Sequence, residues 1–239
     1  TGPPKVVMIT HSNRRAQPET TLAAAEYHAR PHPMISINAL PMAHIFGVGV
    51  MNGTNVTPKE YPAGYIVQEA WFEPERFMQK IQEHKATDIA CVPTMLAMLM
   101  SHPNREQYDM SSLVAVHIGA APVPVDLARA FSETYGCRIR QLYGMTENCG
   151  VATSDRISQP YRPGSAGLPY DGVDLRIFDD QDNELPAGQA GEIVTRGPTT
   201  MKGYFKQPDV TAETMRNGWL HTGDIGYLDE DGWLFVVDR

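Results

Sequence analysis

The sequence has no long apolar run and no cluster of positive charge. None of its apolar stretches approaches the roughly 18 residues of a membrane-spanning helix, and no signal peptide is recognisable. Among its 239 residues, acidic side chains outnumber basic ones by 28 to 20, which gives a formal net charge of −8. A surface of this charge repels a phosphate backbone, so the sequence predicts no nucleic-acid partner and no transmembrane segment.

Cysteine is also scarce, and its spacing indicates no metal or redox chemistry. Cys91, Cys137 and Cys149 have neither C-x-x-C nor metal-ligand spacing, and their number is odd. This pattern excludes a disulfide framework and indicates reduced thiols in a cytoplasmic protein. Apolar residues make up 42% of the sequence and charged residues 20%, as in globular proteins of one large or two modest domains.

Up to about residue 142, short apolar runs alternate with amphipathic stretches. This alternation predicts βαβ units that form a largely parallel sheet with flanking helices. The predicted strands are Met34–Leu40, Tyr65–Val67, Asp88–Val92, Leu113–Ile118 and Arg138–Leu142. The predicted helices begin at Pro74, cover Pro93–Met100, and cover Val125–Tyr135 with Gly136 as a C-cap.

After about residue 158, short apolar runs lie between turns rich in Gly, Pro and Asp. The predicted strands are Asp174–Phe178, Glu192–Thr195 and Trp233–Val237, and a helical period is seen at Val210–Arg216. The sequence therefore predicts an α/β subdomain over residues 1–157 and a β-rich, barrel-like subdomain over residues 158–239.

A polar motif, Gln141-Leu142-Tyr143-Gly144-Met145-Thr146-Glu147, directly follows a predicted strand. Tyr143 can present an aromatic face to a purine. Thr146 offers a hydroxyl to a phosphate, and Glu147 offers a hard carboxylate oxygen to Mg²⁺. Taken alone, these side chains also suit an ordinary polar loop.

Two further motifs follow it, His221-Thr222-Gly223-Asp224 and the terminal Val237-Asp238-Arg239. The three motifs, in this order, resemble those of the adenylate-forming enzymes. That superfamily comprises acyl-CoA synthetases, nonribosomal-peptide adenylation domains and firefly luciferase. The resemblance spans nearly the whole chain and implies a nucleotide site at the ends of two adjacent strands.

The resemblance implies a role for each matching residue. Gly119-Ala120-Ala121-Pro122 would form one wall of the adenine slot, although such a loop also suits an ordinary strand-to-helix connection. Asp224 and Arg239 would hold the ribose. The full set of residues placed at the nucleotide is Thr1, Lys5, Gly119, Ala120, Ala121, Pro122, Gln141, Tyr143, Gly144, Thr146, Asp224 and Arg239. Thr1 and Lys5 match the end of the family's phosphate loop, but Val6 stands where the family usually has Gly.

His44 corresponds to a histidine that acyl- and aryl-CoA synthetases carry beside the substrate carbonyl, although it could also cap the preceding strand. Amino-acid-activating relatives place an aspartate near this position, so His44 favours an acid without an α-amine. The resemblance implies that His44, Thr146 and Glu147 are catalytic and that Glu147 binds Mg²⁺. Where the family has an apolar helix, turn formers and Pro predict that Asn52–Pro58 is not helical.

The resemblance implies ATP-dependent activation of a carboxylic acid to an acyl-adenylate, followed by transfer to CoA, with Mg²⁺ bound. Three alternatives stay open: an amino-acid adenylation domain, a luciferase-like oxygenase, and a non-catalytic nucleotide-binding module. In the family, most of a subdomain precedes the position of Thr1, and a hinge and a small domain follow Arg239 and supply the first-step lysine. We therefore expect the central portion of an acyl- or aryl-CoA synthetase, inactive by itself.

Overall fold

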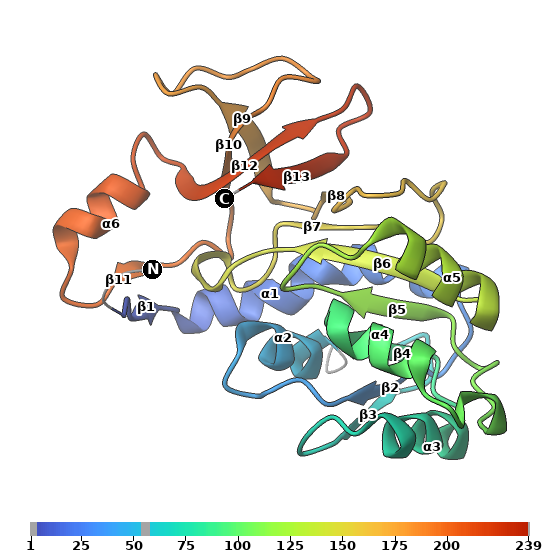
Figure 1. Cartoon of the computed structure of the whole chain (residues 1–239). Helices are drawn as coiled ribbons and strands as arrows, with labels where there is room; N and C mark the ends of the chain where they lie inside the picture. The colour runs from blue at the N-terminus through green and yellow to red at the C-terminus, as the bar shows by residue number, and fades with distance from the viewer. Residues whose placement is uncertain (1–3, 54–57, 239) are drawn as a thin grey trace.

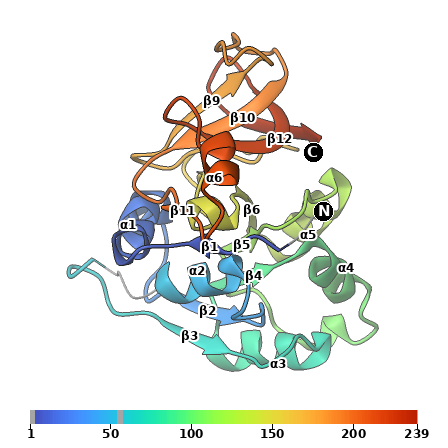
Figure 2. The same ribbon diagram turned by 90° about the vertical axis from the view of Figure 1, so that its left-hand side faces the viewer.

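A computed structural model describes residues 4–53 and 58–238 and contains two main sheets (Figures 1 and 2). The larger sheet has seven strands in the order β3-β2-β4-β5-β6-β7-β8, and the smaller has four in the order β13-β12-β10-β9. A third sheet pairs β1 (Val7–Met8) with β11 (Gly203–Tyr204). No described helix has the length and apolar character needed to cross a membrane. The fold is therefore α/β with a separate antiparallel unit, as the sequence predicted.

The larger sheet is parallel from β3 to β6 and is extended by two antiparallel strands. Its strands are β2 (Ile35–Asn38), β3 (Tyr65–Gln68), β4 (Asp88–Cys91), β5 (Ala115–Ile118), β6 (Arg138–Tyr143), β7 (Thr153–Ser154) and β8 (Leu168–Pro169). All five predicted parallel strands are confirmed. The antiparallel pair β7 and β8 was not predicted, because each strand is two residues long.

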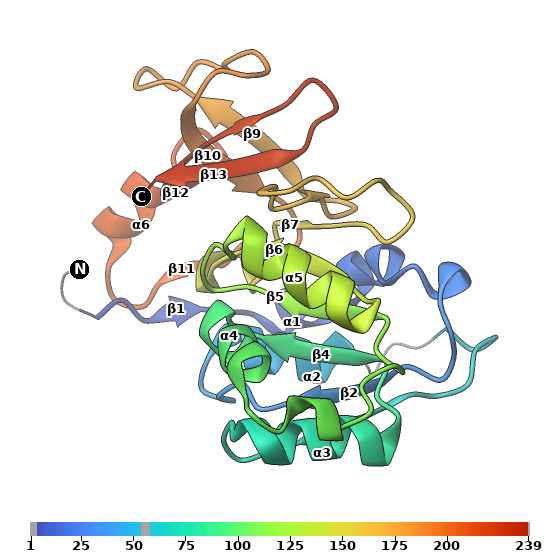
Figure 3. The same ribbon diagram turned by 45° about the vertical axis from the view of Figure 1, so that its right-hand side comes forward.

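One face of this sheet carries the main apolar core. Side chains alternate between faces along a strand, so Ile37, Ile89, Val116 and Ile139 share a face and are buried against helices. These helices are α3 (Pro74–His84), α4 (Pro93–Ser101) and α5 (Val125–Tyr135), with the 3₁₀ turn η4 (Arg105–Gln107) after α4. Figure 3 shows α4 and α5 in front of the strands and α3 along their lower edge, with α1 and α2 behind.

The ends of these helices follow the predicted signals. Pro74 is the first residue of α3, and the Glu73 side chain accepts hydrogen bonds from the backbone N–H groups of Glu75 and Arg76. Helix α5 ends at Gly136, which has φ +65° and donates its N–H to the Ser132 carbonyl. That φ suits Gly, because other residues rarely adopt it. The helix starting at Pro74 and the Gly136 cap are therefore confirmed.

The other face is covered by two helices that the sequence did not predict. These are α1 (His11–Leu22) and α2 (Ile45–Gly53), and the 3₁₀ turns η1 (Ala23–Ala25) and η2 (Tyr27–Ala29) follow α1. The expectation that no helix covers Asn52 and Gly53 was wrong, because the apolar residues before them nucleate α2 and these two form only its last turn. The rest of that stretch, residues 54–57, lies outside the described residues.

The smaller sheet is antiparallel throughout and packs around Leu175, Ile177, Ile193 and Leu234. Its strands are β9 (Asp174–Phe178), β10 (Gly191–Arg196), β12 (Leu220–Leu228) and β13 (Leu234–Asp238), and helix α6 (Pro208–Thr214) precedes β12. Three of these strands were predicted, and β9 and β13 lie at the two ends of an open order. The domain boundary at 157/158 stays a prediction; the strands change from one sheet to the other between β8 and β9.

Candidate nucleotide and acyl site

Two neighbouring strands of the larger sheet end beside each other at the candidate site. Ile118 at the end of β5 is the register partner of Gln141 in β6. The loop Gly119–Pro122 and the segment Tyr143–Glu147 therefore leave the sheet at the same edge, where open α/β sheets bind ligands. Gly144 must be Gly, because a Cβ there would lie 2.4 Å from the Gly150 carbonyl carbon. The 119–122 loop contains only Gly, Ala and Pro, and Gly144 is the one small residue at the start of the second segment.

A hydrogen bond joins this edge to the smaller sheet. The Tyr143 hydroxyl donates to Asp224 Oδ2 at 2.8 Å, although the two residues are 81 positions apart. Asp224 is 8% exposed and lies within β12. Asp224 is not a turn residue despite its two glycine neighbours, because Gly223 and Gly226 interrupt the apolar pattern without ending the strand. The structure thus brings together two residues predicted for the purine and the ribose.

The part of β12 just before Asp224 is held by a residue that sequence reasoning missed. The Glu192 carboxylate accepts the Gly223 N–H at 2.9 Å and lies 2.8 Å from His221 Nδ1. Gly223 has φ +73°, which favours Gly. The Thr222 hydroxyl accepts the Asp224 N–H and donates to the Ile193 carbonyl. Glu192 is a positioning residue for Asp224; no local motif could have revealed it, because β10 and β12 are distant in the sequence.

A second contact connects Glu147 to the N-terminal segment. The Tyr204 hydroxyl donates to Glu147 Oε1 at 2.7 Å, and Lys5 Nζ lies 5.0 Å from the centre of the Tyr204 ring. Burial and the hydrogen bond to Glu147 both raise the pKa of Tyr204 above its usual range, so the hydroxyl stays protonated and donates. The pairing of β1 with β11 places these residues together. Tyr204 was also missed from the sequence.

Val6 stands where the family usually has Gly, and the backbone at Val6 does not need the conformation that Gly allows. Val6 has no positive φ, and its carbonyl accepts the Phe205 N–H at 2.8 Å. The backbone here is extended into β1, so the conformation of the family's Gly is not used. Lys5 nevertheless reaches Tyr204, one side chain away from Glu147.

Glu147 has the chemistry of a Mg²⁺ ligand but stands alone. Its Oε2 atom has no partner among the described residues, while Oε1 is held by Tyr204. In the described part of the chain, no group of three or more His, Cys, Asp and Glu side chains could hold a metal. Mg²⁺ usually takes one or two carboxylates together with waters and substrate phosphates, so Glu147 fits that manner of binding.

His44 lies at the start of α2, where it caps the helix. Its Nδ1 accepts the Phe46 N–H at 3.1 Å, which places the proton of the neutral imidazole on the exposed Nε2. The Phe46 ring is 3.3 Å from where a Cβ of Gly119 would stand. His44 therefore caps α2, the helix whose Phe46 ring packs against Gly119.

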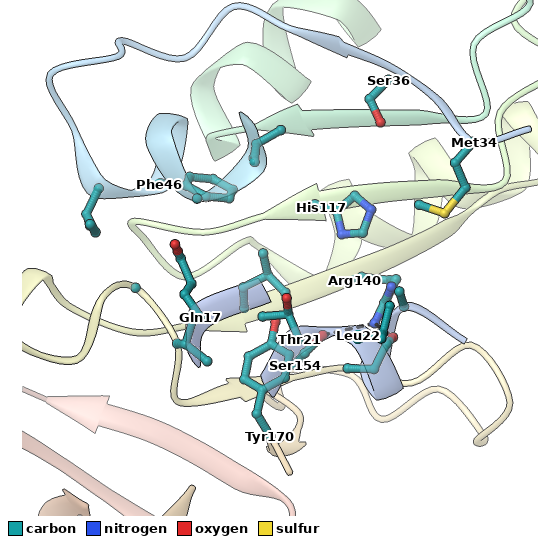
Figure 4. Close-up of a pocket in the computed structure, with 18 residues that line it drawn as sticks. Gln17, Thr21, Leu22, Met34, Ser36, Phe46, His117, Arg140, Ser154 and Tyr170 are labelled. Atoms are coloured by element: carbon teal, nitrogen blue, oxygen red, sulfur yellow. Dashed lines mark hydrogen bonds between the residues drawn. The ribbon is translucent and has the colours of Figure 1, made fainter. Parts of the chain in front are cut away.

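A cavity of about 150 Å³ lies between α1 and α2 on one side and β5 and β6 on the other (Figure 4). Most of its lining is apolar, and Phe46 lies at the end nearest Gly119. His117 and Arg140 project into the cavity from the two strands, side by side and away from Phe46. This arrangement is suited to the acyl part of a substrate whose carboxylate lies at the strand ends.

The other predicted residues are placed as follows. Thr146 is exposed at the start of the 3₁₀ turn η5 (Thr146–Asn148), and Gln141 is half-buried near the end of β6. Thr1 and Arg239 lie outside the described residues. The site that the structure assembles therefore contains Lys5, the 119–122 loop, the end of β6, Glu147 and Asp224, with His44 on the adjoining helix.

Comparisons with known proteins identify the family of this chain. Residues 1–205 match the family model described as AMP-binding enzyme. The long-chain-fatty-acid–CoA ligase of Bacillus subtilis (strain 168) is 34% identical, and the feruloyl-CoA synthase of an Amycolatopsis species is 35% identical. Each alignment covers 100% of this chain, but 42% and 47% of those proteins, respectively. The chain thus spans less than half the length of these curated relatives.

Solved structures show the same fold. The O-succinylbenzoate coenzyme A synthetase of Bacillus subtilis, solved in complex with AMP, superposes with a TM-score of 0.84 at 29% identity. The amide bond synthetase of Marinactinospora thermotolerans superposes with a TM-score of 0.88 at 30% identity. Both similarities cover 100% of this chain and 47% of those structures. On its motifs, its fold and the family match over residues 1–205, the chain belongs to the AMP-binding enzymes of the adenylate-forming superfamily.

Proposed function

We propose that the protein carrying this chain joins a carboxylic acid to the α-phosphate of ATP, releases pyrophosphate, and transfers the acyl group from the adenylate to the thiol of CoA. The hydrogen bond between Tyr143 and Asp224 is the observation that carries the proposal. It places an aromatic ring and a buried carboxylate at one strand edge, as recognition of a nucleoside requires. The names of the CoA ligase relatives support the same reaction.

In this proposal the nucleotide lies across the ends of β5 and β6. The 119–122 loop and Gly144 form the walls of the adenine slot, with Gln141 beside them, and the Tyr143 ring contacts the purine. Asp224 accepts hydrogen bonds from the ribose hydroxyls. Thr146 and Lys5 face the phosphates, and by the resemblance Thr1 and Arg239 complete the phosphate and ribose contacts.

Glu147 is the residue we propose for Mg²⁺. When bound, Mg²⁺ would neutralise the phosphate charge that otherwise repels the incoming carboxylate. The chain's contribution is to hold the Glu147 carboxylate in place through the Tyr204 hydroxyl, leaving Oε2 for the cation. The position of Lys5 against the Tyr204 ring adds positive charge on the same side.

His44 is the residue we propose for the acid substrate. Its Nε2–H can donate to a carboxylate, while an α-ammonium group would gain nothing from it. This chemistry favours a plain carboxylic acid over an amino acid. A cytoplasmic location is part of the proposal, and the buried free thiols of Cys91, Cys137 and Cys149 support a reducing compartment.

The direct test is acid-dependent ATP–pyrophosphate exchange by the full-length protein. Exchange that requires a carboxylic acid, together with acid-dependent consumption of CoA thiol, is the expected result. Adenylate formation without thiol consumption would point to another acceptor, such as the amine implied by the name of the amide bond synthetase. Light emission or oxygen uptake would indicate an oxygenase. Nucleotide binding without exchange for any acid would leave only the non-catalytic module.

Replacing Asp224 by Ala should weaken AMP binding by about 1.5–3 kcal/mol, roughly 10- to 150-fold in Kd, because hydrogen bonds to a charged group are lost. Tyr143→Phe is the matched control, since it keeps the ring and removes only the hydroxyl that donates to Asp224. Calorimetry should show a smaller loss for Tyr143→Phe. An Asp224→Ala protein that melts normally and binds AMP as the wild type does would remove Asp224 from the site.

A further inference from the structure

The face of the larger sheet that meets the cavity carries a buried polar row. Ser36 is the register partner of Asp88, and His117 is the register partner of Arg140. Asp88 and Arg140 are 1% and 2% exposed. The opposite face of the same strands is apolar and packs into the main core. The polar row consists of Ser36, Asp88, His117 and Arg140. It therefore lies only on the face of the sheet that borders the cavity.

Asp88 fixes which nitrogen of His117 carries the proton. One oxygen of Asp88 binds Arg30 and the Thr87 hydroxyl, and the other lies 2.9 Å from His117 Nε2. Burial raises the pKa of Asp88, but His117 and Arg30 outweigh it and hold that pKa below its usual range. Burial lowers the pKa of His117, and the nearby Arg140 charge lowers it further. His117 is thus neutral, with the proton on Nε2 and a bare lone pair on Nδ1.

That lone pair has no partner among the described residues, and the His117 side chain is 22% exposed where it lines the cavity. Arg140 offers the complementary group beside it. Its Nε and Nη2 atoms donate to the carbonyls of Ala24 and Asp155 and to the Ser154 hydroxyl. Its Nη1 has no acceptor in the described part of the chain, although the residue is almost fully buried.

No carboxylate oxygen among the described residues accepts a hydrogen bond from Arg140. The Asp155 side chain is bound by Arg138, at 2.9 and 3.2 Å, and only its main-chain carbonyl reaches Arg140. The donor and the acceptor therefore both open onto the cavity, side by side, where one ligand group that donates and accepts could bind both of them.

We infer that the acid activated by this protein carries a hydroxyl on a single aromatic ring, remote from the carboxylate, which donates to His117 Nδ1 and accepts from Arg140 Nη1. A hydroxyl both donates and accepts, whereas a carboxylate only accepts and an ammonium only donates. This inference rests on the proposed function and names its substrate class.

The dimensions of the cavity favour one ring. An apolar cavity of about 150 Å³ is known to hold benzene, and this one has about that volume. His117 precedes Gly119 by two residues on the same strand face, which corresponds to about 7 Å. A carboxylate at the strand ends can therefore reach the His117 and Arg140 pair across one ring.

The test compares paired acids in the full-length protein by ATP–pyrophosphate exchange: 4-hydroxybenzoate with benzoate, and 4-hydroxycinnamate with cinnamate. In at least one pair the hydroxylated acid should have a kcat/KM higher on the order of 10²-fold, since its absence leaves buried polar groups unpaired. His117→Leu should reduce this ratio about tenfold, because Leu has no acceptor for the substrate hydroxyl, while Arg30 and Thr87 still hold Asp88. Met34→Leu, an apolar control in the same lining, should change both acids of a pair by the same factor.

Each other outcome has a defined meaning. Equal kcat/KM within both pairs, or a preference for terephthalate or octanoate, would overturn the hydroxyl assignment while the adenylation reaction stands. A hydroxyl preference that His117→Leu leaves intact would show that His117 does not recognise the hydroxyl. If that variant does not fold, the wild-type ratios still decide. AMP binding without exchange for any acid would instead overturn the proposed function.

Discussion

Replacing Arg30 by Met should lower the free energy of unfolding by about 3–5 kcal/mol, the usual cost of leaving a buried charge without its partner. The side chains of Arg30 and Asp88 are 0% and 1% exposed, and they form an ion pair between the segment after η2 and β4. Without Arg30, the Asp88 carboxylate keeps the hydrogen bonds from Thr87 and His117 but loses this charge. Chemical denaturation with urea measures the difference.

The exposed pair of Arg129 and Asp126 is the matched control. These side chains are 62% and 89% exposed, so Arg129→Met should change stability by no more than about 0.5 kcal/mol. Combining Arg30→Met with Asp88→Leu should recover part of the loss, because removing both charges also removes their desolvation cost. A cost for Arg30→Met as small as that of the control would show that Asp88 does not need this cation.

The elements that could be predicted from the sequence are those with local signals at both ends. Helix α3 begins at Pro74, and α5 ends at Gly136, where Pro and Gly act as ordinary caps. Helix α1 was missed because it contains Pro18 and has no apolar stripe; Asn13 anchors it by donating to the carbonyls of Pro198 and Thr200. Because Asn13 and Pro198 are 185 positions apart in the sequence, no local sequence pattern indicates this contact.

The same distinction applies to the candidate site. Tyr143, Thr146 and Glu147 follow a strand in one short motif, so the sequence could place them together. Tyr204 and Glu192 were missed because their partners are 57 and 31 residues away. His117 and Arg140 left a usable signal, since His117 stands between Val116 and Ile118, and Arg140 alternates with Ile139, whose face is core. Period-two alternation therefore marks the polar row, but only the register shows that the two side chains are adjacent.

Glu147→Gln should lower the kcat of ATP–pyrophosphate exchange in the full-length protein by about 10²–10³-fold, the usual cost of losing one preorganised group that stabilises developing charge. The amide keeps the size of the side chain and can still contact the Tyr204 hydroxyl, but it lacks the negative charge that a hard cation requires. The Kd for AMP should change by less than about tenfold, because the adenine and ribose contacts at Tyr143 and Asp224 are untouched. The Mg²⁺ concentration for half-maximal exchange should rise.

Tyr204→Phe tests whether Glu147 acts through its charge or through its position, because this variant keeps the charge and removes the hydrogen bond that holds the carboxylate. This variant keeps the ring that Lys5 lies over and the carboxylate of Glu147, and it removes one hydrogen bond of 2.7 Å. Losing a hydrogen bond of this kind costs about 1.5–3 kcal/mol at most when the acceptor is charged, and solvent can replace it at a half-buried carboxylate. The kcat should therefore fall less than in Glu147→Gln, with little change in the Mg²⁺ requirement. Equal losses of kcat in the two variants, with unchanged dependence on Mg²⁺ in both, would mean that Glu147 acts by supporting Tyr204 and the β1–β11 pairing, and the metal role would have to be assigned elsewhere.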